Sequence, residues 1–163
     1  MTENTQKRDQ ILTLEDKELL QLCKIDTFVG RGPGGQKRNK TETAVRVTHL
    51  QSGISASNDE SRSQHLNLIK ATQALRLEIA ANIRQEAEEW QAKTPGINSK
   101  LYPLWLAKVL DAMEETDYKI SEAAKILNTS TAQLSKDIAR SPNACQIINQ
   151  GRTRNKLSPL KWK

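Results

Sequence analysis

The twelve residues from Val29 to Lys40 combine four glycines, one proline and four basic side chains with a single glutamine, Gln36. Glycine adopts backbone conformations closed to other residues and lets a main chain approach another molecule closely, whereas Pro33 restricts the loop. Basic side chains in such a loop indicate that the molecule approached carries phosphate. The four basic residues are Arg31, Lys37, Arg38 and Lys40.

The chemistry expected of Gln36 is hydrogen-bond donation. Its side chain is neutral and cannot act as a general base near pH 7, but the side-chain amide and the backbone N–H both donate. A backbone N–H aimed at a developing negative charge stabilises the transition state of acyl transfer, and removing one such donor costs about 3–4 kcal/mol. This chemistry depends on the peptide group more than on the side chain.

Other catalytic or metal-binding arrangements are not indicated. No serine, cysteine or aspartate is placed like a conventional nucleophile beside a base, and His49 and His65 stand apart, each interpreted as structural or as an RNA contact. Cys23 and Cys145 lack the spacing of metal ligands, so we expect two buried or half-buried thiols, with no zinc site, disulfide framework or cofactor.

The composition favours a polyanionic partner. The formal net charge is +6 and the isoelectric point about 9.4, which on its own is weak evidence for nucleic-acid binding. The N-terminal residues 1–6 are polar and lack the apolar core of a signal peptide, and no apolar run is long enough to span a membrane. We therefore expect a cytoplasmic protein.

The elements around the glycine-rich stretch predict a small antiparallel sheet. Residues 13–22 predict a short helix with Thr13 as its N-cap, and residues 23–29 alternate as a half-buried strand that runs into the stretch. Residues 44–50 alternate again, and residues 54–57 follow a turn at 51–53 as a returning strand.

Helical periodicity replaces alternation from Ser63 to about Ala92. One apolar stripe predicts a long helix that covers the sheet, which makes the fold class α+β. The stripe comprises Leu68, Ala71, Leu75, Ile79, Ile83, Ala87 and Trp90. Pro95 and Gly96 then interrupt the pattern, so residues 1–92 are interpreted as one domain and residues 93–100 as a linker.

Residues 101–150 are interpreted as an all-helical module. A helix is predicted at 101–115, followed by two short helices separated by a turn at Asn128–Thr129, with Ser130 and Gln133 as a capping box. The pair is typical of a helix-turn-helix, although a plain antiparallel pair explains it equally well. A last short helix begins at Ser141–Pro142 and ends near Gly151.

Residues 151–163 form a basic tail with five basic residues and no acid. The tail is either a solvated end of the chain or a segment that lies along phosphates, with Trp162 stacked on a base.

The sequence closely resembles the catalytic domain of bacterial class I peptide chain release factors over roughly residues 20–92. The resemblance rests on Gly34-Gly35-Gln36 within residues 31–40, on Thr43–Leu50 and on Arg62–His65, in that order. It implies hydrolysis of the ester between nascent peptide and tRNA on the ribosome. Gly34, Gly35 and Gln36 would be the catalytic residues, and a methyltransferase would modify the Gln36 amide.

The resemblance also implies RNA contacts and a subclass. The RNA-binding candidates are Arg31, Lys37, Arg38, Lys40, Arg62 and Gln64, joined in the tail by Arg152, Arg154 and Lys156. About twenty residues precede the first strand and none suggests a stop-codon reader, so we expect codon-independent release from stalled ribosomes, as in short ribosome-rescue members of the family. The helical module departs from those members. The alternatives are a non-enzymatic RNA- or DNA-binding protein and a codon-dependent release factor.

Overall fold

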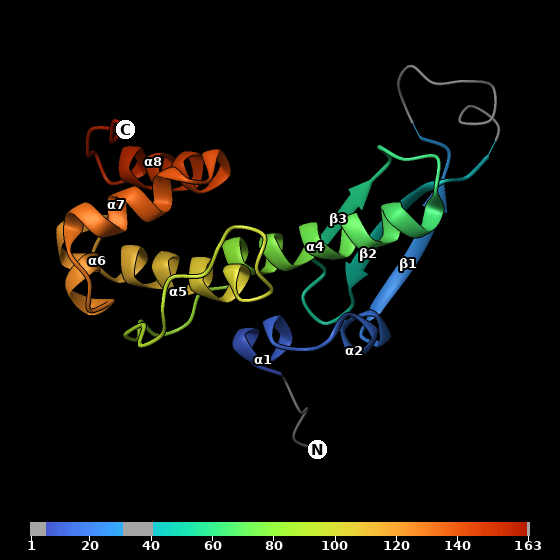
Figure 1. Ribbon diagram of the computed structural model, residues 1–163, viewed down its shortest axis with the longest axis horizontal. Helices are drawn as coiled ribbons and strands as arrows, with labels where there is room; N and C mark the ends of the chain where they lie inside the picture. The colour runs from blue at the N-terminus through green and yellow to red at the C-terminus, as the bar shows by residue number, and fades with distance from the viewer. Residues whose placement is uncertain (1–5, 31–40, 163) are drawn as a thin grey trace. The chain divides into compact units, whose positions relative to one another are not determined.

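The computed structural model describes residues 6–30 and 41–162, which contain seven helices and three strands (Figure 1). The chain divides into two compact units, Met1–Ile79 and Ala80–Lys163. The first contains α1 (Arg8–Leu12), α2 (Asp16–Gln21), β1 (Cys23–Phe28), β2 (Ala44–His49), β3 (Ser55–Asn58) and most of α4 (Gln64–Asn82). The second contains α5 (Tyr102–Glu115), α6 (Ile120–Ile126), α7 (Thr131–Ala139) and α8 (Pro142–Arg154). The α+β class, with a small sheet and a long helix, is confirmed.

The three strands form one antiparallel sheet in the order β1-β2-β3. Val47 on the central strand pairs with Ile25 on β1 and with Ala56 on β3. Val45 and Val47 are buried while Arg46 between them is exposed, so the alternation along β2 separates a core face from an outer face. The strand predictions are confirmed to within a residue at each end.

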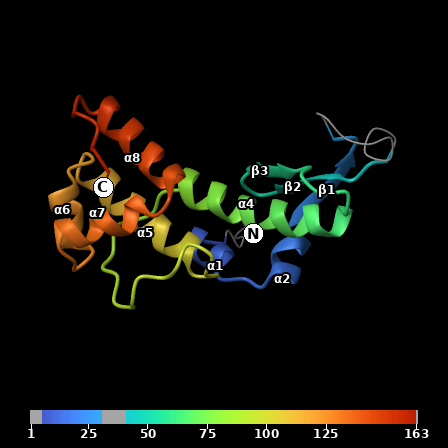
Figure 2. The ribbon, with the colours of Figure 1, turned by 45° about the horizontal axis from the view of Figure 1, so that its top comes forward.

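Helix α4 lies against this sheet (Figures 1 and 2). Ala71, Leu75 and Ile79 of the expected apolar stripe have no exposed surface. They are spaced four residues apart, so they share one face of the helix and bury it together with the core face of β2.

The expected continuation of this helix to Ala92 is wrong, because α4 ends at Asn82. The following residues run as an extended segment along α5 within the second unit. Asp111 accepts the backbone N–H of Gln85 at 3.0 Å, and Glu115 accepts that of Ala87 at 3.1 Å. These carboxylates take backbone donors that a continuing helix would have bonded internally, and so replace helical hydrogen bonds with tertiary ones.

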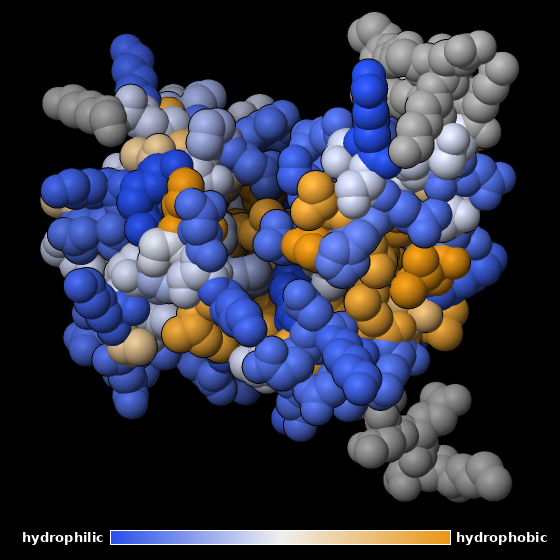
Figure 3. Space-filling model, turned by 45° about the vertical axis from the view of Figure 1, so that its right-hand side comes forward, coloured by the Kyte–Doolittle hydropathy of each residue, from blue (hydrophilic) through white to orange (hydrophobic). Residues whose placement is uncertain are grey.

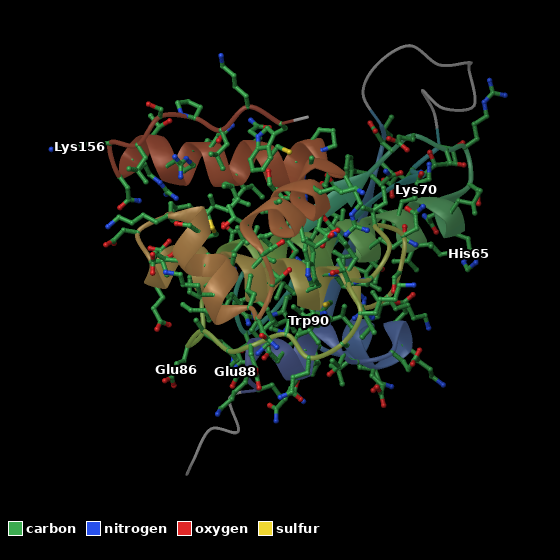
Figure 4. All side chains as sticks on the ribbon, turned by 60° about the vertical axis from the view of Figure 1, so that its left-hand side comes forward. His65, Lys70, Glu86, Glu88, Trp90 and Lys156 are labelled. Carbon is green, nitrogen blue, oxygen red and sulfur yellow. The ribbon has the colours of Figure 1, made fainter. Side chains whose placement is uncertain are left out.

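Lys108 on α5 adds an ion pair with Glu88 of the same segment. Figure 4 labels Glu86, Glu88 and Trp90, which project from this extended stretch rather than from a helix.

The expected helix at residues 13–22 is the shorter α2, which is preceded by a helix, α1, that was not expected, and Thr13 is not an N-cap. Thr13 is the C-cap of α1, where its hydroxyl donates to the Asp9 carbonyl at 3.0 Å. Glu15 is the N-cap of α2, and its N–H donates to the Glu18 side chain at 3.1 Å. The residue between them, Leu14, offers its carbonyl to Arg76 of α4 at 2.7 Å.

The second unit is built around α5, whose residues from Tyr102 to Met113 are all buried except Leu104. Ser130 caps α7 by accepting the Gln133 N–H at 3.1 Å, and Ser141 caps α8 by accepting the Ala144 N–H at 3.3 Å. Both caps are confirmed. The Gln133 side chain instead donates to Asp137 at 3.0 Å, so the reciprocal half of the expected capping box is missing.

Helix α8 continues to Arg154, past its expected end near Gly151. Gly151 is buried in the last turns of the helix, and a Cβ placed there would come within 2.1 Å of the Tyr118 ring. Glycine at this position therefore permits the close approach of Tyr118 rather than ending the helix.

We predict that Gly151→Ala destabilises the second unit by roughly 1–3 kcal/mol, because overpacking against Tyr118 outweighs the better helix propensity of alanine. Urea unfolding measures the change. Gly96→Ala is the matched control, since a Cβ at Gly96 meets nothing within 4 Å. Equal stability of the two variants would contradict the packing argument.

Candidate active site

The stretch expected to carry the chemistry, residues 31–40, lies outside the described residues, and with it Gly34, Gly35, Gln36, Arg31, Lys37, Arg38 and Lys40. The structure describes the stem that carries this stretch. Phe28, the last residue of β1, pairs with Ala44, the first residue of β2. Antiparallel pairing holds opposed residues about 5 Å apart, so the chain leaves and re-enters the sheet at neighbouring points.

The returning arm of the stem is fixed to α4 by Asn67, which has no exposed surface. Its side-chain Nδ2 donates to the carbonyls of Thr43 at 2.8 Å and Ser61 at 2.9 Å. Its Oδ1 accepts the Ser61 N–H at 2.9 Å. A single amide thus joins the residue before β2 to the turn before α4, and all of its bonds go to backbone groups.

Asn67 was not identified from the sequence as a residue that supports the stem, although its position in the sequence indicates this role. It stands four residues before Ala71 and eight before Leu75, on the stripe that packs against the sheet. A polar residue on an apolar stripe requires buried hydrogen-bond partners, which here belong to the stem.

A second link holds Glu42, one residue further toward the stretch. The Gln64 side chain donates to the Glu42 carbonyl at 2.9 Å, and the Thr27 hydroxyl donates to the Glu42 carboxylate at 3.2 Å. Gln64 therefore helps to position the stem, while its expected contact with RNA stays a prediction. Arg62, another expected RNA contact, is exposed.

Arg46 is an exposed cation that the list of candidates omitted. Its guanidinium lies over the Phe28 ring, 5.3 Å from the ring centroid. This cation–π contact places positive charge on the outer face of the sheet, at the end from which residues 31–40 depart.

His49 lies at the opposite end of β2, paired with Cys23, and is 1% exposed. Its Nδ1 is 2.8 Å from the Ser52 hydroxyl, and burial lowers its pKa. The structural interpretation therefore suits His49, whereas His65 is exposed at the start of α4 (Figure 4). Cys23 and Cys145 are free thiols, and burial raises the pKa of both, which keeps them protonated.

Within residues 6–30 and 41–162, no group of three or more His, Cys, Asp or Glu side chains could hold a metal ion. No helix in these ranges combines the length and the apolar character needed to cross a membrane.

A family model described as RF-1 domain matches residues 9–101, which include both arms of the stem, Asn67 and Gly34-Gly35-Gln36. The chain belongs to this family. Its sequence is 41% identical over 80 residues to peptide chain release factor 1 of Rhodospirillum rubrum, covering 49% of this chain and 22% of the relative. It is 45% identical over 83 residues to the protein of the same name from Delftia acidovorans, covering 51% and 22%.

A longer match reaches beyond the RF-1 domain. Peptide chain release factor 1 of Rickettsia typhi is 33% identical over 124 residues, covering 70% of this chain and 34% of the relative. The chain thus spans between about a fifth and a third of the length of the curated relatives it matches.

The remaining candidates, Arg152, Arg154 and Lys156, belong to the second unit. The Arg152 guanidinium donates to the carbonyls of Ser158 and Tyr118, both at 2.8 Å. Arg154 and Lys156 are exposed.

We predict that Asn67→Ala lowers the free energy of unfolding of the first unit by roughly 1–3 kcal/mol, because buried backbone groups of Thr43 and Ser61 lose their partner. Chemical denaturation of the full chain measures the loss. Gln73→Ala, an exposed position on the same helix, is the control and should change little. Similar stabilities for the two variants would show that Asn67 does not support the stem.

We predict that His49 makes the protein less stable in mild acid. Since the folded-state pKa lies below the ordinary value of 6.5, the folded state binds the proton less tightly, and stability is lost as the pH falls below about 6.5. Unfolding free energies measured between pH 7.5 and 5 should fall less steeply for His49→Gln than for the parent or His65→Gln. Three equal slopes would contradict the prediction.

Proposed function

We propose that this chain hydrolyses the ester between nascent peptide and tRNA in the peptidyl transferase centre of the ribosome. The observation that carries the proposal is Gly34-Gly35-Gln36 within a matched RF-1 domain, between two strands whose facing ends, Phe28 and Ala44, pair in the sheet. Asn67 bonds the Thr43 carbonyl just before the second of these strands. The resemblance stated for residues 31–40, 43–50 and 62–65 supports the same reaction.

In this proposal, water attacks the ester carbonyl carbon and the bond to the ribose oxygen breaks, which releases the peptide acid and restores the ribose hydroxyl. The Gln36 backbone N–H donates to the oxygen that gains negative charge, and its side chain positions the water. Gly34 and Gly35 supply the backbone geometry, and the ribosome supplies the rest of the site. A methyltransferase acting on the Gln36 amide is a proposed partner.

Four basic residues of the stretch bring it to RNA by neutralising phosphate, and Arg62 and Arg46 add exposed positive charge to the same unit. The residues that neutralise phosphate in the stretch are Arg31, Lys37, Arg38 and Lys40.

Release is codon-independent in this proposal and serves stalled ribosomes. The support is the helical unit that contains α5–α8, which offers a route to ribosome attachment that needs no codon. The relatives named peptide chain release factor 1 make codon-dependent release the alternative. The α6–α7 pair favours a second alternative, a non-enzymatic RNA- or DNA-binding protein, in which substitution of Gln36 leaves translation unaffected.

We predict that Gly35→Ala lowers peptide release by at least two orders of magnitude while ribosome binding is retained, because the added methyl obstructs the backbone approach. The assay follows labelled peptide leaving purified ribosomes that carry peptidyl-tRNA. Gly96→Ala is the control and should release peptide like the parent.

The same assay separates the alternatives when the content of the ribosomal A site is varied. Release that is fast without mRNA and slow with a sense or stop codon supports rescue. Release that depends on the codon supports a codon-dependent factor. Undiminished release by Gly35→Ala would refute the catalytic assignment, and no release by the parent under any condition would favour the non-enzymatic alternative.

A further inference from the structure

The positive charge of the chain is concentrated after residue 117. Residues 118–163 contain nine of the 25 basic residues but only two of the 19 acidic ones, Glu122 and Asp137. The preceding 117 residues contain sixteen basic and seventeen acidic residues and are nearly neutral, even though they include the four cations of the glycine-rich stretch. The basic character of the protein thus belongs mainly to α6, α7, α8 and the tail.

Both acids in this segment are engaged. Glu122 pairs with Lys125 on the same helix at 3.2 Å. Asp137 accepts hydrogen bonds from the Thr94 hydroxyl at 3.1 Å and from the Gln133 amide at 3.0 Å. Glu122 is thus paired with a cation, whereas Asp137 is bonded to neutral donors and keeps its negative charge.

Helices α6 and α7 are joined as in a helix-turn-helix. Four residues, 127–130, connect them, and Asn128 has a φ of 57°, a left-handed conformation that asparagine tolerates better than most residues. The inner faces of the two helices are buried. The buried residues are Ala123, Ala124, Leu127, Leu134 and Ile138.

The other face of α7 carries no fully exposed acid, although the half-buried Asp137 lies one turn after Gln133 on the same side. Its exposed side chains are Thr131, Ala132, Gln133 and Lys136. In helix-turn-helix proteins this face of the second helix meets nucleic acid. The Gln133 amide already donates to Asp137, so the side chains of this face that are left for nucleic acid are Thr131 and Lys136, which can contact phosphates as well as base edges.

The tail is part of the fold of the second unit. Asn149 on α8 donates to the Leu160 carbonyl at 3.1 Å and accepts the Leu160 N–H at 2.8 Å, while Arg152 binds the Ser158 carbonyl. Arg152 is therefore a positioning residue, because its donors hold the tail and Tyr118.

The cations next to it remain available. Arg154, Lys156 and Lys161 are exposed, and none has a carboxylate partner in the part of the chain that the structure describes. Lys156 projects from the end of α8 (Figure 4), and hydrophilic side chains dominate the visible surface of this unit (Figure 3). A shallow groove on α8 adds the neutral amides of Gln146 and Gln150. Asn149 and Thr153 also line the groove, but the Asn149 side chain is bonded to Leu160 and the Thr153 hydroxyl donates to the Asn149 carbonyl.

We propose that α7 and the C-terminal part of α8, with the tail folded on it, bind double-helical RNA through its phosphates and 2′-hydroxyls. The proposal rests on the proposed function, which places the chain on the ribosome. A-form RNA is recognised mainly by shape and by backbone contacts across its shallow minor groove. Exposed cations and the Thr131 hydroxyl suit that surface, and the proposed function, which places the chain on the ribosome, favours RNA over DNA as the ligand.

The test is binding of the purified full chain to an RNA duplex of about 20 base pairs and to a DNA duplex of equivalent sequence, over a series of salt concentrations. We expect tighter binding to RNA, with little dependence on its sequence. Lys136→Ala and Arg154→Ala should each weaken binding about three- to tenfold and reduce the salt slope by about one. Lys125→Ala is the matched control, because Lys125 is an exposed lysine of the same unit already paired with Glu122.

Three results would overturn the inference: no binding to the RNA duplex, equal behaviour of all three variants, or tighter and sequence-dependent binding to DNA. Gly35→Ala separates this inference from the proposed function. Gly35→Ala should bind the RNA duplex like the parent, whether or not the parent releases peptide. A parent that releases peptide but ignores duplex RNA would leave the proposed function standing and remove this inference alone.

Discussion

The first unit depends on one buried amide. Asn67 makes three hydrogen bonds to backbone groups of the buried Thr43 and the half-buried Ser61, and without them the Thr43 carbonyl would lose its buried partner. An unpaired buried polar group costs far more than a formed hydrogen bond contributes, so this arrangement tolerates few alternatives. By bonding Thr43, Asn67 fixes the residue at which β2 begins. Strand pairing alone would allow β2 to begin earlier or later.

The rest of the unit supports this link through α4. The helix packs on the sheet through the buried side chains of Ala71, Leu75 and Ile79. Its Arg76 donates to the carbonyls of Leu12 and Leu14. The apolar and the polar contacts have different effects. Apolar burial supplies most of the free energy but is indifferent to small shifts along the helix, whereas the polar contacts of Asn67 and Arg76 specify the register. A reaction that depends on the placement of one peptide N–H requires such a specified support.

Local patterns in the sequence predicted the elements whose conformation depends on neighbouring residues. Alternation at residues 44–50 predicted β2, and the hydroxyls of Ser130 and Ser141 predicted two helix starts, because each signal concerns neighbouring residues. The end of α4 was not predictable in this way. Carboxylates on α5, Asp111 and Glu115, take the backbone donors of residues 85 and 87, and no periodicity within residues 63–92 reveals a partner more than twenty residues away.

The candidate site also combines a feature visible in neighbouring residues with one that depends on distant partners. The glycine-rich stretch was found from residue types alone, whereas the role of Asn67 required knowing what its stripe packs against. Thr13 is a further case. Threonine is favoured at N-caps, but here its hydroxyl donates to a carbonyl of the preceding helix α1, which was not predicted from the sequence.

Under the proposed function, the distribution of charge gives the two units different roles in binding. Positive charge attracts RNA without regard to sequence, so it supplies affinity but cannot choose a site. The choice of a binding site must come from groups held in a fixed geometry. In the first unit that geometry is the stem built by Asn67, and in the second it is the turn at Asn128 and the tail held by Asn149 and Arg152. Under the proposed function, the glycine-rich stretch, which has four cations, gains from a second, more strongly basic attachment, because linked sites bind together with an effective concentration that neither has alone. In that proposal residues 1–117, which are nearly neutral overall, meet the substrate through geometry, while most of the electrostatic attraction arises in residues 118–163.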